Sequence, residues 1–226
     1  MIFRELEFLV KRPCGREELA DKRAFRVKIN HVIDSIFLRL PRIKTKSLKK
    51  LNCYASNSEV DKVISNNDGY VAVHIAYPNV ESIWAMNHSD AVKCVKIVLR
   101  KGLVLISNSE PEIKNNLQLL LELVDTGDEP FDYVRNIKRS HKSRKFKCYG
   151  VVEIRKNIYS SVVIVSDKLG NSERFCITEV EPFLGYVDLG FDKLLWEGDS
   201  ILGFTEKSQA FRLKPSIVAA SRKLEK

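Results

Sequence analysis

Apolar positions near the start of the chain follow first a strand pattern and then a helix pattern. Residues 2–10 partly alternate between apolar and polar side chains, which predicts a strand. Residues 32–40 carry apolar side chains at helical spacing, and Pro41 ends the predicted helix. Periodicity leaves open an extended chain from Phe25 onward, because helix and strand patterns overlap in short apolar runs.

Helices and strands alternate in the pattern from residue 58 to residue 107. The apolar side chains at 60–64 predict a short helix, and residues 70–77 predict a strand that follows an Asn-Asp-Gly turn. A capped helix is expected over 89–101, with Gly102 in the place of a C-terminal helix glycine. The run Leu-Val-Leu-Ile-Ser at 103–107 then predicts a short buried strand.

The pattern at 109–126 predicts one amphipathic helix of about four turns. Ser109 and Glu112 have the spacing of a capping box, and Pro111 suits a first turn, where no amide hydrogen bond is needed. The apolar residues of the helix recur every three or four positions: Ile113, Leu117, Leu120, Leu121 and Val124. We expect the helix to end at Thr126-Gly127.

Short β-branched runs dominate the chain after residue 147. Five of them predict strands, at 148–155, 159–167, 174–180, 185–191 and 200–206. Residues 168–171 (Lys-Leu-Gly-Asn) predict a hairpin connection. The whole pattern predicts a mixed α/β (α+β) fold, with an α/β layer over 1–128 and a charged junction over 129–147. Residues 148–226 would form a smaller antiparallel sheet or open barrel with a basic C-terminal tail.

Positive charge is concentrated in two segments of this pattern. The first basic segment, residues 39–50 (RLPRIKTKSLKK), holds six Lys or Arg, and the second, residues 135–147 (RNIKRSHKSRKFK), holds seven. Neither contains an acid. Since the formal net charge of the chain is +9, the remainder of the chain is net negative. A concentrated patch of this kind can act as a binding site, whereas scattered charge mainly favours solubility.

A dense run of cations favours contact with a polyanion, because neutralising phosphates releases counterions. We therefore expect a non-enzymatic intracellular protein that binds RNA or DNA through the second basic segment, with help from the first. The candidate contact residues are Arg135, Lys138, Arg139, Lys142, Arg144, Lys145 and Lys147, with Lys46, Lys49 and Lys50 from the first segment. Tyr133, Phe146 and Tyr149 lie beside or within the second segment, and exposed bases stack on such rings.

Other interpretations of the same cations stay open. The second segment could be a solvated linker that is neutralised by the acidic run before it. That run consists of Glu122, Asp125, Asp128, Glu129 and Asp132. A protein-interaction module of the inhibitor or immunity type would instead bind an acidic partner protein. The run KRSHKSRKFK is also typical of a nuclear-import signal. Phosphorylation of Ser140 or Ser143 could alternatively control the charge of this segment.

Catalytic motifs are missing from the sequence. It contains no phosphate-binding glycine loop, no G-x-S-x-G and no H-E-x-x-H, so we expect no catalytic residue, metal or cofactor. The remaining enzymatic alternative is a divergent metal-dependent nuclease. Such an enzyme would use Asp132 and Glu153, followed by Arg155 and Lys156.

The sequence also bears on compartment and on disulfides. No apolar run reaches the roughly 20 residues of a membrane-spanning helix, and charges at Arg4, Glu5 and Glu7 interrupt the N-terminal apolar stretch, unlike a secretory signal. We expect an intracellular protein, cytoplasmic or, in a eukaryote, nuclear. Five cysteines without any C-x-x-C predict free structural thiols rather than disulfides or a zinc site.

Overall fold

The structure is a computed structural model that describes residues 1–10, 19–182, 190–206 and 208–223. The chain divides into two compact units. Unit 1 is Met1–Glu129 with Pro182–Leu184, and unit 2 is Pro130–Glu181 with Gly185–Lys226. In the described ranges, no helix combines the length and the apolar character needed to cross a membrane.

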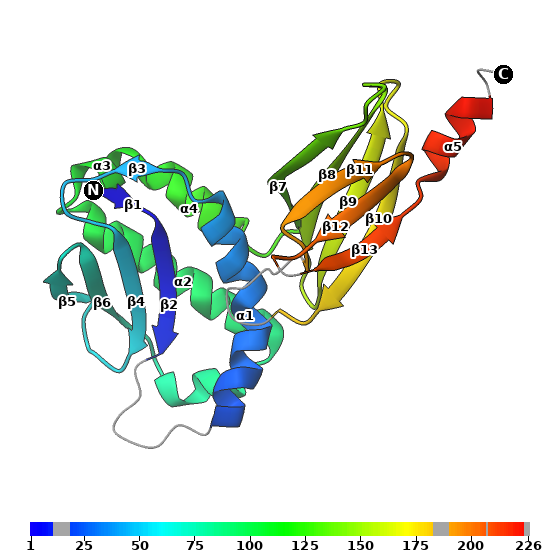
Figure 1. The fold of residues 1–226 in the computed structure, drawn as a ribbon. Helices are drawn as coiled ribbons and strands as arrows, with labels where there is room; N and C mark the ends of the chain where they lie inside the picture. Colours follow the sequence, from blue (N-terminus) through cyan, green and yellow to red (C-terminus); the bar gives the residue numbers. More distant parts are fainter. Residues whose placement is uncertain (11–18, 183–189, 207, 224–226) are drawn as a thin grey trace. The chain divides into compact units, whose positions relative to one another are not determined.

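Unit 1 is built on a four-stranded mixed sheet (Figure 1). Its strands lie in the order β2 (Glu5–Val10), β4 (Lys50–Ser56), β6 (Tyr70–Ala76) and β5 (Lys62–Asn67). The first three are parallel, and β5 is antiparallel to β6. Two short strands, β1 (Ile2–Phe3) and β3 (Ile43–Lys44), pair with each other. The strand predicted at 2–10 is therefore confirmed, with an interruption at Arg4.

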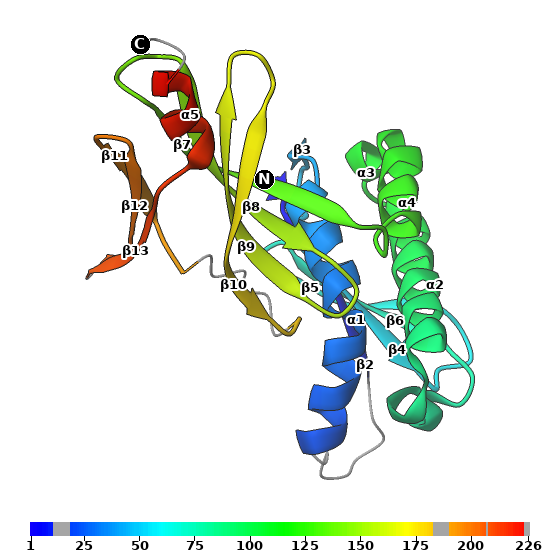
Figure 2. The ribbon, with the colours of Figure 1, turned by 90° about the vertical axis from the view of Figure 1, so that its right-hand side faces the viewer.

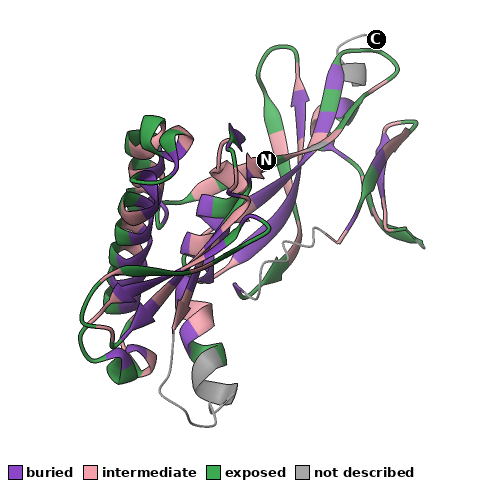
Figure 3. Cartoon of the chain, turned by 90° about the vertical axis from the view of Figure 1, so that its left-hand side faces the viewer, coloured by how far each residue is buried: buried purple, intermediate pink, exposed green. Residues whose placement is uncertain are grey.

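Helices of unit 1 pack against one face of this sheet (Figures 1 and 2). The helical elements are α1 (Leu19–Arg39), the 3-10 helix η1 (Val80–Ala85), α2 (His88–Ser107), α3 (Pro111–Asn115) and α4 (Leu117–Asp125). Leu51, Cys53 and Ala55 alternate along β4 and are fully buried, as expected for a strand with one covered face. Figure 3 shows buried and exposed positions alternating around the helices as well. The predicted helix before Pro41 is confirmed as the C-terminal part of α1.

Two segments of unit 1 have a different secondary structure from the one predicted. Residues 103–107 are the last turns of α2, because Leu103 and Ile106 continue the buried face that Val95 and Leu99 begin. Gly102 therefore lies inside the helix, where a Cβ atom would overlap the Sγ of Cys53 on β4. In the segment 60–64, predicted as a short helix, residues 62–64 are instead the start of the exposed edge strand β5, where β-branched Val63 and Ile64 favour an extended chain.

The helix predicted at 109–126 is divided into α3 and α4. Asn116 separates them, with φ −108° and ψ 8°, outside the helical range. The expected capping box is not formed, since Glu110 is the N-cap residue and the hydroxyl of Ser109 donates to the carbonyl of Ile106 at 3.1 Å. The amphipathic pattern was nevertheless informative, because Ile113, Leu120 and Val124 are all buried.

Unit 2 contains two antiparallel sheets that do not close into a barrel (Figure 2). The first has the order β10 (Ser172–Val180), β9 (Tyr159–Asp167), β8 (Phe146–Ile154) and β7 (Phe131–Ser140). The second consists of β11 (Lys193–Glu197), β12 (Ser200–Phe204) and β13 (Gln209–Leu213), and helix α5 (Ser216–Lys223) follows. The predicted antiparallel sheet is confirmed, as is the hairpin at 168–171. Most of the strand predicted at 185–191 lies outside the described residues.

Candidate functional site

The second basic segment forms most of a β hairpin, which we call the basic hairpin (residues 135–147). It comprises the end of β7, a turn and the start of β8, so most of the segment predicted as a charged junction lies within regular structure. The turn is closed by backbone bonds from His141 N to Phe146 O and from Arg144 N to His141 O, both 2.9 Å. Arg144 has φ +58°, the left-handed conformation that side chains other than glycine seldom adopt.

Side chains fix the conformation of this turn. The Nδ1 atom of His141 accepts from the amide of Ser143 at 3.3 Å, and the hydroxyl of Ser143 accepts from the amide of Lys145 at 3.2 Å. The Nε2–H of His141 can then donate to the carbonyl of Gly198, 3.0 Å away in the turn between β11 and β12. The turn is thus fastened to the second sheet of unit 2.

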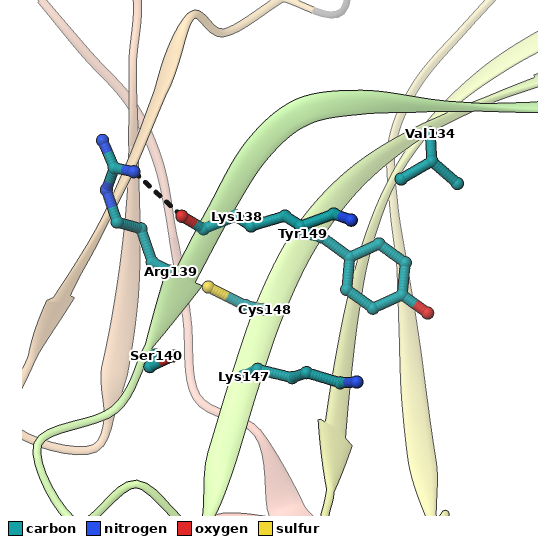
Figure 4. Close-up of a pocket in the computed structure, with 7 residues that line it drawn as sticks. All are labelled: Val134, Lys138, Arg139, Ser140, Lys147, Cys148 and Tyr149. Atoms are coloured by element: carbon teal, nitrogen blue, oxygen red, sulfur yellow. Dashed lines mark hydrogen bonds between the residues drawn. The ribbon is translucent and has the colours of Figure 1, made fainter.

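The strand register separates the cations of the basic hairpin into two faces. Lys138 lies opposite Tyr149, and Ser140 lies opposite Lys147, so these side chains share one face of the sheet. Arg139 lies opposite Cys148 and belongs to the other face. Figure 4 shows Lys138, Lys147 and Tyr149 extending to the same side, away from the side chains of Arg139 and Cys148.

We call the first of these the lysine–tyrosine face (Lys138, Lys147 and Tyr149). The two lysines are exposed and Tyr149 is half-buried. An open pocket of about 440 Å³ adjoins it. Its lining residues are Val134, Lys138, Arg139, Ser140, Lys147, Cys148 and Tyr149 (Figure 4). The turn of the hairpin carries three further exposed cations: Lys142, Arg144 and Lys145. Arg135 differs from the other cations, because it is partly buried and donates to the carbonyl of Phe191 at 3.4 Å.

The acidic run before the basic hairpin has partners of its own. In unit 1, Asp125 is paired with Arg100, and Asp128 lies 2.5 Å from the ammonium of Lys96. Burial would raise the pKa of Asp128, but the hydrogen bond and charge of Lys96 outweigh it and the pKa is lowered. In unit 2, Asp132 is paired with Arg155 at 2.6 Å. Three of the acids that could neutralise a linker are therefore already paired with other cations.

Within the part of the chain that the structure describes, no acid lies within ion-pair distance of Lys138, Lys142, Arg144 or Lys147. An exposed cation without a neighbouring carboxylate is available to neutralise a phosphate, and that neutralisation releases the counterions condensed on the nucleic acid. These four residues are consequently suited to contact a polyanion, as is Arg139, which is exposed on the other face of the hairpin.

The first basic segment belongs to unit 1, and two of its cations are bound by groups of that unit. Arg39 donates to the backbone oxygen of Thr126 at 2.8 Å, at the C-terminal end of α4. Lys50 lies 3.0 Å from Glu5 and 2.8 Å from Glu7 on β2, so its charge is already balanced. The ammonium of Lys49 lies 6.0 Å from the centre of the Tyr70 ring, and Lys46 is exposed.

The carboxylates of the nuclease alternative lie side by side but are held by arginines. Asp132 and Glu153 are direct partners across β7 and β8. Arg155 binds the first, and Arg174 binds the second through two hydrogen bonds of 2.8 and 2.7 Å. A cation at this position would have to displace both arginines. Among the described residues, no group of three or more His, Cys, Asp or Glu side chains has a metal-binding arrangement.

The structure also separates the three aromatic residues noted near the second basic segment. Phe146 is buried at 6% exposure, and Tyr133 lies opposite Val152 on the face away from the two lysines. Tyr149 alone of the three shares a face with them. The alternation of residues 146–149 (Phe-Lys-Cys-Tyr) carried this signal, since Lys147 and Tyr149 must point the same way along one strand.

Comparison with known proteins identifies no relative of the chain. No family model, no curated protein and no solved structure matches the chain.

Proposed function

We propose that this protein binds RNA or DNA through the basic hairpin. The observation that carries the proposal is the pairing of charges: the acids next to the hairpin in sequence are bound by other cations, whereas Lys138, Lys142, Arg144 and Lys147 are exposed without a described acidic partner. Their strands and turn are held by hydrogen bonds, so little backbone conformational entropy is lost when these side chains contact phosphates.

Salt dependence tests the electrostatic part of this proposal. If four cations each neutralise a phosphate, affinity should fall on the order of 10²-fold between 50 and 200 mM salt. The measurement is fluorescence anisotropy of a labelled mixed-sequence oligonucleotide, titrated with the full chain at several salt concentrations. Affinity that stays unchanged over this range would contradict the proposal.

A matched pair of charge variants tests the position of the site. The hairpin variant carries Lys138→Gln, Lys142→Gln, Arg144→Gln and Lys147→Gln. The control variant removes the same amount of charge at four exposed lysines elsewhere, through Lys62→Gln, Lys114→Gln, Lys156→Gln and Lys193→Gln. We expect the hairpin variant to lose at least tenfold in affinity and most of the salt dependence, and the control to lose much less.

Two outcomes would overturn the proposal. One is an equal loss of affinity in both variants, which would show only a general effect of net charge. The other is a failure to bind any oligonucleotide together with tight binding of poly-glutamate, which would favour an acidic protein as the partner. Thermal unfolding monitored by circular dichroism confirms that both variants are folded, and we expect nearly unchanged midpoints because all eight side chains are exposed.

A further inference from the structure

Tyr149 occupies a position on the basic hairpin that charge alone does not explain. Its ring is half-buried on the lysine–tyrosine face, next to an open pocket of about 440 Å³. Lys138 lies directly across from it on β7, and Lys147 lies two residues before it on β8. The aromatic ring therefore has a lysine on each of two sides (Figure 4).

The geometry of a sheet sets the scale of this arrangement. Residues two apart on a strand are separated by roughly 7 Å, and diagonal neighbours on paired strands by about 7–8 Å. Lys138 and Lys147 are diagonal neighbours of this kind, because Lys138 lies opposite Tyr149 and Lys147 lies opposite Ser140. Two flexible ammonium groups can thus reach phosphates on either side of a base that rests on the ring.

The row of side chains across the sheet continues this surface. Tyr149 lies opposite Ile164 on β9, which is partly exposed, and Ile164 lies opposite Arg174 on β10. Arg174 is engaged by Glu153, so the row passes from a free lysine through a ring and an apolar side chain to a paired arginine. An apolar and aromatic strip between cations matches a base with its phosphates rather than a bare phosphate chain.

We infer that the ligand of the basic hairpin is single-stranded nucleic acid, with one base stacked on Tyr149 and the adjoining phosphates contacted by Lys138 and Lys147. The inference rests on the proposed function. A duplex keeps the faces of its bases stacked inside and offers mainly phosphates to such a surface, whereas a single strand exposes base faces that a ring can bind. Stacking of this kind tolerates every base, so the site selects strandedness rather than sequence.

The experiment compares one oligonucleotide as a single strand and as a duplex with its complement. Affinities are measured for the wild-type chain and for Tyr149→Phe, Tyr149→Leu and Tyr149→Ala. We expect the wild type to prefer the single strand. Tyr149→Ala and Tyr149→Leu should weaken single-strand binding about 5- to 150-fold, the range found for loss of one stacked base, and leave duplex binding unchanged. Tyr149→Phe keeps the ring and should bind nearly as the wild type does.

The variants also distinguish the inference from the proposed function. If Tyr149→Leu binds the single strand as tightly as the wild type while the hairpin charge variant loses both ligands, the stacking inference is overturned and the proposed function stands. If neither set of variants changes the binding of either ligand, both are overturned. Tyr149→Leu preserves an apolar side chain at the half-buried position, so a loss of binding there cannot be attributed to an unfolded sheet when the thermal midpoint is retained.

Discussion

The ring of His141 packs edge-on against the ring of Trp196, with centroids 4.9 Å apart and planes at 73°. This contact joins the turn of the basic hairpin to β11 in the second sheet of unit 2. The indole Nε1–H of Trp196 also donates to the carbonyl of Arg139 at 3.3 Å. His141 and Trp196 therefore hold the backbone on either side of Ser140, immediately before the exposed cations of the turn.

We predict that His141→Ala loosens the turn and weakens oligonucleotide binding. The substitution removes the hydrogen bond to Gly198 and the aromatic contact with Trp196. Together these should lower the free energy of unfolding of unit 2 by about 1–2 kcal/mol. Binding should weaken only a few-fold, because the cations remain but must be ordered when the ligand binds.

Urea unfolding followed by tryptophan fluorescence measures this effect. A Trp84→Phe background leaves Trp196 as the single tryptophan, so that the signal reports unit 2. The control is Lys156→Ala in the opposite turn, after β8, where the side chain is exposed. Unchanged hydrogen exchange of the amides at 141–146 in His141→Ala would show that the contact does not hold the turn.

A second prediction concerns the close approach of α2 to the sheet of unit 1. Gly102 faces β4 so closely that a Cβ atom would overlap the Sγ of Cys53. Alanine favours a helix by about 1 kcal/mol over glycine, but overpacking a core costs about 1–3 kcal/mol. We expect Gly102→Ala to lower the free energy of unfolding by up to about 2 kcal/mol, measured by chemical denaturation.

The partner of that contact supplies the control. Cys53→Ala removes the sulfur atom, so the double variant Cys53→Ala/Gly102→Ala should lose less stability than the sum of the two single variants. We expect a coupling of about 1 kcal/mol in favour of the double variant. If the losses of stability are additive, α2 shifts away from β4 in Gly102→Ala, and the contact between residues 102 and 53 does not determine the cost of the substitution.

Two segments show where the fold could be predicted from the sequence and where it could not. Residues 159–167 were predicted as a strand and form β9 with those bounds, because the four consecutive β-branched residues at 162–165 favour a strand. Gly102 resembles the cap of a helix that ends there, although only its contact with Cys53 accounts for it. Residues 103–107 were misassigned for that reason, since tertiary packing outweighs local propensity.

The candidate site was likewise predictable in composition but not in arrangement. Charge counting located Lys138 and Lys147, and the nearby rings were noted with them. Alternation along β8 places Tyr149 on the face of Lys147, but whether Lys138 joins them depends on the register of β7 against β8, and that register shifts at an irregularity between Val134 and Lys138. A one-residue slip would move Tyr149 away from Lys138, so the combination of residues is a property of strand pairing.

A third prediction concerns the thiols. Cys53, Cys94 and Cys148 are buried, while Cys176 is exposed on β10. Burial raises the pKa of Cys94 to about 11 and that of Cys148 to about 12, so both are almost fully protonated at pH 8.5. We expect iodoacetamide to modify Cys176 at least tenfold faster than these two.

Peptide mass spectrometry after timed labelling measures that difference. Cys14 lies outside the described residues, and Cys14→Ser removes it from the comparison. In denaturant the four remaining thiols should react at similar rates, because the protection comes from the fold. Rapid labelling of Cys148 in the folded protein would show instead that β8 opens readily.

The last prediction follows from the pairing of Glu153 with Arg174. The hydrogen bonds from Arg174 lower the pKa of Glu153 below its usual value of 4.5, against a smaller opposing effect of burial. A carboxyl whose pKa is lower in the folded than in the unfolded state stabilises the fold above the unfolded pKa, and this contribution is lost as the pH falls through the folded pKa.

Since Arg174 is about half exposed, we expect Glu153→Gln to lower the free energy of unfolding by only about 0.5–1 kcal/mol at pH 6. The difference between wild type and variant should shrink toward pH 3, whereas Glu206→Gln, at an exposed position of unit 2, should show little difference at either pH. Urea titrations of the Trp84→Phe background at both pH values measure it, and a difference that persists unchanged at pH 3 would mean that packing rather than the ion pair accounts for the effect.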